Sequence, residues 1–156
     1  MKGRTEILLV EDNQHDQELI LQILGQENLA DTTQAVENGS EALDFIFCRG
    51  AFSGRNCEPP RLVLLDLNLP RVSGLEVLQQ IKSDACASTI PVAVLTSSRE
   101  GRDLAASYQL GANSYIQKPV ELQQFREAVR RTALYWLVTN QRPVAQDTRA
   151  TRQAAP

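Results

Sequence analysis

The chain has 156 residues, of which 42% are hydrophobic and 22% charged, and its formal net charge at pH 7 is -3. This length suits one domain with a buried core, and the composition is that of an ordinary globular protein, not a disordered or membrane-embedded one. The small negative charge provides no broad surface for nucleic acid or an anionic membrane, so direct DNA binding is not expected.

Three cysteines are present, Cys48, Cys57 and Cys86. They are odd in number and include no CxxC pair, so they form neither a disulfide framework nor a zinc-binding pattern. We expect small packing or loop residues, not redox centres. The sequence also shows no apolar stretch typical of a signal peptide or a membrane span. These features predict a protein of the reducing cytoplasm.

Short apolar runs alternate along the chain with longer amphipathic segments. The short runs predict five buried strands, at residues 6–10, 32–36, 62–65, 92–95 and 114–116. The longer segments have helical spacing and predict helices at residues 16–26, 40–48, 75–83, 102–110 and 122–138. Strict alternation of strands and helices predicts an α/β fold: a doubly wound parallel sheet with right-handed crossovers and helices on both faces.

Two segments lie outside this alternation. Residues 47–61 contain Gly, Ser, Asn and two consecutive prolines, and they predict a surface loop without chemistry of its own. From residue 140 to 156 the chain is rich in Gln, Arg, Ala, Thr and Pro and lacks apolar periodicity, which predicts a flexible tail. We therefore expect one domain over residues 1–139, without an output domain.

Polar side chains follow four of the predicted strands. These residues are Glu11, Asp12, Asp66, Thr96 and Lys118. Ligands of open parallel α/β sheets bind at the carboxyl ends of the strands, so we expect this set to converge. Crowded carboxylates repel one another unless a cation lies between them, and their oxygens suit Mg²⁺ or Mn²⁺. We expect Asp12 and Asp66 to be the main metal ligands.

This set of side chains can form and hold an aspartyl phosphate. Once a metal neutralises part of the charge, the Asp66 carboxylate can attack phosphorus. Lys118 offers three donors to one phosphoryl oxygen, and the Thr96 hydroxyl can bond another. Each residue alone also has an ordinary explanation, as a helix cap, a strand residue or a surface lysine. An acid directly after the apolar run at 62–65 is costly to bury without a partner, which favours function.

The motifs LLVEDN, LLDLNLPRVSGLEVL, LTSS and YIQKP resemble those of the receiver domains of two-component response regulators (CheY-like), over residues 5–139. The resemblance implies a flavodoxin-like sheet with strand order 2-1-3-4-5. It also implies that Glu11 and Asp12 help to bind Mg²⁺ and that the backbone carbonyl of Asn68 completes the metal shell. Asp66 would accept its phosphoryl group from a sensor histidine kinase. Such a domain catalyses only its own phosphorylation and dephosphorylation.

The resemblance further implies a switch and a cis peptide bond. In this family, phosphorylation draws in the hydroxyl that matches Thr96 and lets the aromatic residue that matches Tyr115 turn inward, which changes the partners bound. The lysine matching Lys118 binds the phosphate, and the bond to the next residue, Pro119, is commonly cis. By its residue type alone, Tyr115 is also explained as a β-favouring residue. We expect His15 to be an exposed imidazole without a phosphotransfer role, because the phosphohistidine belongs to the kinase.

The finer resemblance is to small regulators that pair with bacterial and cyanobacterial phytochrome histidine kinases. It rests on the run DLNLPRVSGLEVL, the long segment before the third predicted strand and Trp136 in the last helix. It implies a phytochrome kinase as partner. Because no output domain is expected, the output would come from binding a downstream protein, from relaying the phosphoryl group to a further phosphotransfer partner, or from draining phosphate from a kinase.

The last predicted helix carries two groups of residues. One row, spaced by three and four, is expected to face the core: Leu122, Phe125, Val129, Thr132 and Trp136. The other group points elsewhere and predicts a homodimer through this helix: Leu134, Tyr135 and Val138.

Two other function classes are weaker. A haloacid-dehalogenase-like phosphatase also forms an aspartyl phosphate, but it needs a second acid where this chain has Asn68, and an amide cannot act as a general acid. A flavodoxin-like electron carrier needs a hydroxyl- and glycine-rich phosphate loop after the first strand, where the acidic run EDNQHD would repel phosphate.

Overall fold

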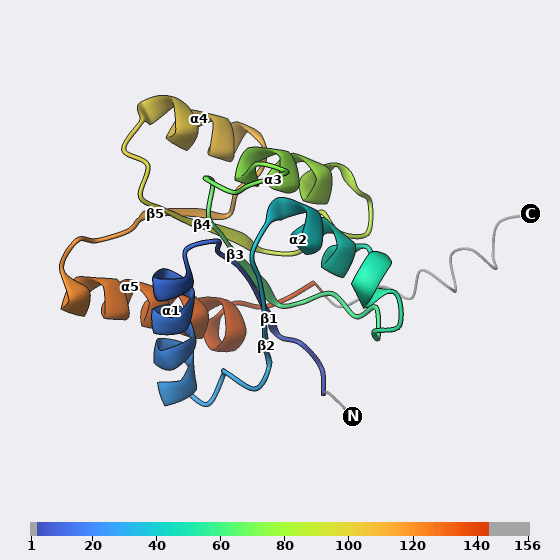
Figure 1. The fold of residues 1–156 in the computed structure, drawn as a ribbon, viewed down its shortest axis with the longest axis horizontal. Coiled ribbons are helices and arrows are strands. Elements are labelled where there is room, and N and C mark those ends of the chain that lie inside the picture. The colour runs from blue at the N-terminus through green and yellow to red at the C-terminus, as the bar shows by residue number, and fades with distance from the viewer. Residues whose placement is uncertain (1–2, 144–156) are drawn as a thin grey trace, which may run out of the picture.

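The computed structural model describes residues 3–143. A five-stranded parallel sheet with strand order β2-β1-β3-β4-β5 is flanked by helices on both faces (Figure 1). This arrangement confirms the expected doubly wound α/β fold. None of the helices within residues 3–143 is long and apolar enough to cross a membrane.

Each expected strand and helix is present, with small shifts at its ends. The strands are β1 (Ile7–Val10), β2 (Thr33–Val36), β3 (Leu62–Leu65), β4 (Val92–Thr96) and β5 (Ser114–Gln117). The helices are α1 (Gln14–Gln26), α2 (Gly39–Ile46), α3 (Gly74–Ser83), α4 (Gly101–Gln109) and α5 (Leu122–Leu134). A short 3₁₀ helix, η1 (Gly50–Phe52), lies before β3, and a π-helical turn, η2 (Tyr135–Thr139), continues α5.

The central strands are apolar on both faces because both faces are covered. Side chains of β1 alternate: Leu8 and Val10 join the core beneath α2 and α3, whereas Ile7 and Leu9 join the core beneath α1 and α5. Figure 1 shows α1 and α5 on one side of the sheet and α2 and α3 on the other. This two-sided burial explains the continuous apolar runs of β1 and β3. Apolar and polar residues alternate only in strands of a sheet that has one face exposed to solvent.

The core-facing row of the last helix differs in part from the prediction. The buried residues are Phe125, Val129, Ala133 and Leu137. Phe125 and Val129 were expected there, but Leu122 is 52% exposed and Trp136 is only partly buried against the same core. The amide of Asn140 donates to the carbonyl of Tyr135, a bond characteristic of a wider π turn. This turn carries Leu137 to the core.

The expectation for two of the cysteines was wrong. Residues 47–61 fold back on the end of α2, so that Cys48 and Cys57 form a disulfide with their Cα atoms 6.0 Å apart. A spacing pattern along the sequence does not report this distance, which the fold of the loop sets. Cys86 is free and exposed, as a surface residue would be. Of the predicted tail, residues 144–156 lie outside the described part of the chain.

Candidate functional site

Three carboxylates meet at the carboxyl edge of the sheet. Glu11 and Asp12 follow β1, and Asp66 follows the neighbouring strand β3. One oxygen from each lies within 4.8 Å of the other two. The side chains of Glu11 and Asp66 are 2% and 7% exposed, whereas Asp12 is exposed. The sheet thus forces two buried acids together and leaves the third facing solvent.

Backbone amides hold the two buried acids in place. The amide of Asn13 donates to Oε1 of Glu11 over 3.1 Å, and the amide of Asn68 donates to Oδ1 of Asp66 over 3.3 Å. Each acid keeps a second oxygen that faces Lys118.

Lys118 follows β5 and is the cation of the site. Its Nζ donates to Oε2 of Glu11 over 2.8 Å and lies 3.5 Å from Oδ2 of Asp66. It also donates to Oδ2 of Asp16, 2.9 Å away in the first turn of α1. The four side chains therefore form one partly buried charged network from β1, α1, β3 and the end of β5.

The Glu11 carboxyl has a raised pKa, chiefly because it is buried. Burial, together with the smaller effect of the nearby Asp66 charge, raises its pKa from 4.5 to about 7. The hydrogen bond from Lys118 opposes both effects but does not overcome them. For Lys118 itself, burial alone would lower the pKa, but the bond to Glu11 and the charge of Asp66 outweigh burial and raise it. Lys118 is therefore protonated at neutral pH.

The donor set fits a hard divalent cation. It consists of carboxylate oxygens, and the exposed Asp12 leaves one side open to water, as Mg²⁺ requires. A cation placed among the three acids would relieve the repulsion that raises the pKa of Glu11. Asn68 follows Asp66 by two residues in the same turn, so its carbonyl remains a prediction as a fourth ligand.

A glycine fixes the turn that carries Asp66. Gly74 is the first residue of α3, and its amide donates to the carbonyl of Leu67 over 3.0 Å. A Cβ atom at this position would lie 2.3 Å from the carbonyl oxygen of Asp66 and 2.5 Å from the Cα of Leu67, closer than atoms can approach. Glycine is therefore needed for α3 to pack directly against the acceptor turn.

Thr96 and Tyr115 lie on the adjacent strands β4 and β5. Thr96 is fully buried, and its Oγ1 accepts a hydrogen bond from the amide of Ser98 over 3.2 Å. The Tyr115 hydroxyl is buried without a hydrogen bond of normal geometry, and burial raises its pKa. The neighbouring Ser98 hydroxyl donates instead to Asp103 of α4 over 2.5 Å. Ser98 nevertheless lies close enough to Tyr115 to oppose the rise in its pKa, so the hydroxyl is held only weakly in this position.

Residues 7–130 match the family described as "Response regulator receiver domain". The chain belongs to that family. Its matched segment begins at the first residue of β1 and ends within α5, so the receiver domain includes every residue of the charged network.

The receiver is similar over most of its length to three response regulators, two of which are described as phytochrome or bacteriophytochrome response regulators. Rcp1 of Synechocystis sp. is 37% identical over 139 residues, which cover 89% of this chain and 93% of Rcp1, and its Mn(2+)-bound form has a TM-score of 0.81. The phosphorylated cyanobacterial phytochrome response regulator RcpA is 38% identical, with a TM-score of 0.83, over 91% of this chain and 100% of that one. The bacteriophytochrome response regulator AtBRR is 45% identical, with a TM-score of 0.70, over 89% and 99%.

One residue of the receiver site was missed by sequence reasoning, and one geometric expectation was wrong. Asp16 was not singled out, although an acid one helical turn after Asp12 can face back toward the strand ends.

The peptide bond before Pro119, expected to be cis, is trans, as are the other peptide bonds between residues 3 and 143. The trans form is the ordinary preference of X-Pro bonds, by about 0.5–1 kcal/mol, and only the family resemblance had argued against it. His15 is exposed, as expected.

Proposed function

We propose that this receiver acts as a response regulator of a two-component phosphorelay and accepts a phosphoryl group on Asp66 from a sensor histidine kinase. One observation carries the proposal: Asp66 is a buried carboxylate that shares Lys118 with Glu11 and lies in a three-carboxylate cluster. No other acid in the cluster is placed in this way, because Glu11 is bonded more closely by Lys118 and Asp12 faces solvent.

The chemistry is a transfer between two nucleophiles. An Asp66 oxygen attacks phosphorus, the bond from phosphorus to the kinase imidazole breaks, and its electron pair returns to that nitrogen. Lys118 then shifts its hydrogen bonds from carboxylates to a phosphoryl oxygen. Hydrolysis reverses the modification when water attacks the same phosphorus. Turnover is incidental to signalling.

We propose Mg²⁺ as the metal, with Mn²⁺ as a substitute. Both ions take oxygen ligands in octahedral geometry, and the Mn(2+)-bound form of the similar Rcp1 supports this choice. Glu11, Asp12 and Asp66 would hold the ion with the Asn68 carbonyl. The bound ion would neutralise charge on the transferring group.

The proposed output is a switch through Thr96 and Tyr115. Thr96 is the last residue of β4, the strand beside β3. From there its buried hydroxyl can turn toward a phosphoryl oxygen on Asp66. Its movement would free space that the unpaired Tyr115 hydroxyl can occupy, and so change the surface formed by α4 and β5. Partners would then read that surface.

We also propose that the partner kinase is a phytochrome kinase. Similarity to RcpA and AtBRR over almost the whole receiver supports this pairing.

We further propose a cytoplasmic location and a working domain of residues 1–139. The net charge of -3 supports a protein partner in preference to nucleic acid.

The test of the acceptor is intact-protein mass after incubation with acetyl phosphate. We expect one phosphoryl adduct that requires Mg²⁺ and is absent in Asp66→Asn. Asp31→Asn is the matched control, because Asp31 is exposed and far from the acidic cluster in the fold. An adduct that persists in Asp66→Asn, or none on the folded native protein, would contradict the assignment.

The test of the partner is phosphotransfer from purified kinases already labelled on histidine. We expect transfer from a phytochrome kinase to be at least tenfold faster than transfer from a histidine kinase of another sensory class. Equal rates would contradict the phytochrome pairing and leave the acceptor assignment standing.

A further inference from the structure

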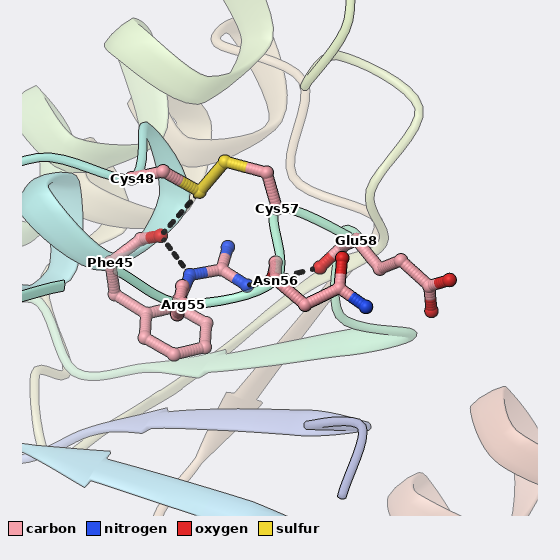
Figure 2. The surroundings of a disulfide bond; sticks show 6 residues. All are labelled: Phe45, Cys48, Arg55, Asn56, Cys57 and Glu58. Atoms are coloured by element: carbon pink, nitrogen blue, oxygen red, sulfur yellow. Dashed lines mark hydrogen bonds between the residues drawn. A yellow bond between two sulfur atoms is a disulfide. The ribbon is translucent and has the colours of Figure 1, made fainter. Parts of the chain in front are cut away.

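A disulfide closes the segment between α2 and β3 at the surface of the receiver. Cys48 comes two residues after the end of α2, and Cys57 lies nine residues further along the chain. Cys57 is exposed and Cys48 is partly exposed, so a small thiol can reach the bond. Figure 2 shows the bond beside Phe45 and Arg55, which belong to the helix and the loop respectively.

The same segment is also held by contacts that do not depend on sulfur. The guanidinium of Arg55 lies 3.9 Å from the centre of the Phe45 ring, and its Nε donates to the Phe45 carbonyl over 2.8 Å (Figure 2). Its Nη1 donates to the carbonyls of Asn56 and Glu58. These bonds tie the residues on either side of Cys57 to the last turns of α2.

A second contact holds η1, the earlier part of the loop, against α2. Phe52 of η1 packs edge-to-face on Phe45, with ring centroids 5.2 Å apart, and is partly buried against the core. The loop can therefore stay near α2 after the disulfide is cut, and the two sulfurs remain within reach of each other. Sγ of Cys48 lies 3.9 Å from the Phe45 carbonyl, which can accept from a Cys48 thiol.

We propose that Cys48 and Cys57 are a reversible dithiol–disulfide pair that reacts with glutathione-type thiols and sets how firmly residues 49–56 are held on α2. An incoming thiolate attacks the exposed sulfur of Cys57, the S–S bond breaks, and Cys48 leaves as a thiolate that takes a proton. A second thiol then attacks the mixed disulfide and releases Cys57. In total, two molecules of reduced glutathione are oxidised to one of oxidised glutathione, and the protein disulfide becomes two thiols. Oxidised glutathione drives the reverse exchange.

The pair lies at the opposite edge of the sheet from Asp66. Helix α2 runs antiparallel to the strands, so its carboxyl end and the start of β3 lie at the amino edge, whereas Asp66 follows the carboxyl end of β3. Redox change in the loop is therefore expected to leave phosphorylation intact. The loop would therefore respond to the thiol redox state independently of the phosphoryl site.

The test uses the full chain under native conditions. The protein is equilibrated with excess reduced or oxidised glutathione and alkylated, and its intact mass is measured. On the same samples, amide hydrogen exchange is followed over residues 49–56. We expect three alkylated cysteines after reduction; after oxidation, Cys48 and Cys57 should carry neither an alkyl group nor glutathione, whereas the exposed Cys86 carries one glutathione. Exchange in the segment should be faster by about tenfold or more in the reduced form. Cys48→Ser and Cys57→Ser should exchange like the reduced protein in both buffers, and Cys86→Ser like the native chain.

Other outcomes would overturn the proposal. These are Cys48 and Cys57 that are alkylated or carry separate glutathione adducts in oxidised glutathione, a bond that reduced glutathione cuts only after unfolding, or exchange over residues 49–56 that is the same in both forms. Phosphorylation by acetyl phosphate is measured on the same samples. Normal labelling of Asp66 with no redox cycling overturns this inference alone, whereas cycling without labelling contradicts only the proposed function.

Discussion

Lys118 and Glu11 form a buried ion pair, with Nζ and Oε2 2.8 Å apart and side chains 9% and 2% exposed. The pair joins the end of β5 to the end of β1, which are not neighbours in the sheet. Because Glu11 has a raised pKa despite this partner, the pair only partly offsets the cost of burying two acids. The metal-free site therefore keeps an uncompensated cost of buried negative charge, on which the effects of replacing Lys118 and of changing the pH depend.

Replacing Lys118 by Met should destabilise the metal-free receiver by roughly 3–5 kcal/mol, because it leaves Glu11 and Asp66 buried without a cation. Mg²⁺ should restore part of this loss, since it neutralises the same acids. Urea unfolding with and without Mg²⁺ measures both effects. Arg102→Met is the control: it removes the exposed pair with Glu100 and should change stability by less than about 1 kcal/mol. Equal stability of the Lys118 variant and the native chain would refute the argument.

The stability of the metal-free receiver should fall as pH rises from 4.5 to about 7. Glu11 has a folded-state pKa of about 7 against an ordinary 4.5, so the folded protein binds the extra proton in this window and loses the benefit as pH rises. The contribution is at most about 3 kcal/mol. Denaturant unfolding in a chelator measures it, and Glu11→Gln should show a flatter pH profile. Identical profiles for the two proteins would contradict the raised pKa.

Gly74→Ala and Gly101→Ala form a matched pair, because each glycine is the first residue of a helix. A Cβ at Gly74 meets the backbone of Asp66 and Leu67, whereas a Cβ at Gly101 meets nothing within 4 Å. We expect Gly74→Ala to cost at least about 1–3 kcal/mol and to slow labelling of Asp66. Gly101→Ala should be neutral or stabilising by up to about 1 kcal/mol. Similar effects of both changes on unfolding and labelling would argue against the close approach.

Lys82 is a structural lysine and should be sensitive to substitution. Its Nζ donates to the carbonyls of Ser88 and Ile90 and to Oδ1 of Asn113, which also accepts from the amide of Val92. Lys82→Met removes the Lys82 donor from the carbonyls of Ser88 and Ile90, while Oδ1 of Asn113 keeps its bond from Val92, and the change should cost roughly 2–4 kcal/mol. Asn113→Ala removes part of the same hydrogen-bond network, so the double variant should lose less stability than the sum of the losses in the two single variants. Additive losses in thermal unfolding would show that the two residues act separately.

The predicted homodimer concerns the end of the last helix. Tyr135 and Val138 are 49% and 73% exposed, but Leu134 is half-buried and can contribute less than expected. Tyr135→Asp with Val138→Asp should reduce dimer content at least tenfold by light scattering at micromolar concentration. Val120→Asp is the control, because Val120 is 88% exposed and precedes α5. A native chain that is monomeric with and without a phosphoryl group would refute the dimer.

Much of the fold could be predicted because its signals are local. The buried runs of β1 and β3 are continuous, and the side chains Asn13, Asn38 and Ser73 cap α1, α2 and α3. The position of Asp66 directly after an apolar strand likewise predicted where it lies. Topology then brings the strand ends together, so the acidic cluster followed from the order of the elements.

The remainder depends on distances that no local pattern encodes. The pairing of Cys48 with Cys57 is set by how Arg55 and Phe52 fold the loop onto Phe45. The role of Asp16 depends on the direction of one side chain across the site, and the burial of Leu137 depends on a π turn that propensity does not distinguish from an α turn.

Lys118 has three ammonium hydrogens and, in the resting receiver, three carboxylates around it: Glu11, Asp16 and Asp66. Its Nζ donates to Glu11 and Asp16 and only approaches Asp66, at 3.5 Å, so one ammonium hydrogen is left for a phosphoryl oxygen, and a second becomes available when one of the bonded carboxylates is released. Asp16 is the most exposed of the three, at 28%, and is the one that water can most easily replace. Release of Asp16, the side chain that sequence reasoning overlooked, would therefore let Lys118 bind the phosphoryl group through two hydrogen bonds in place of one.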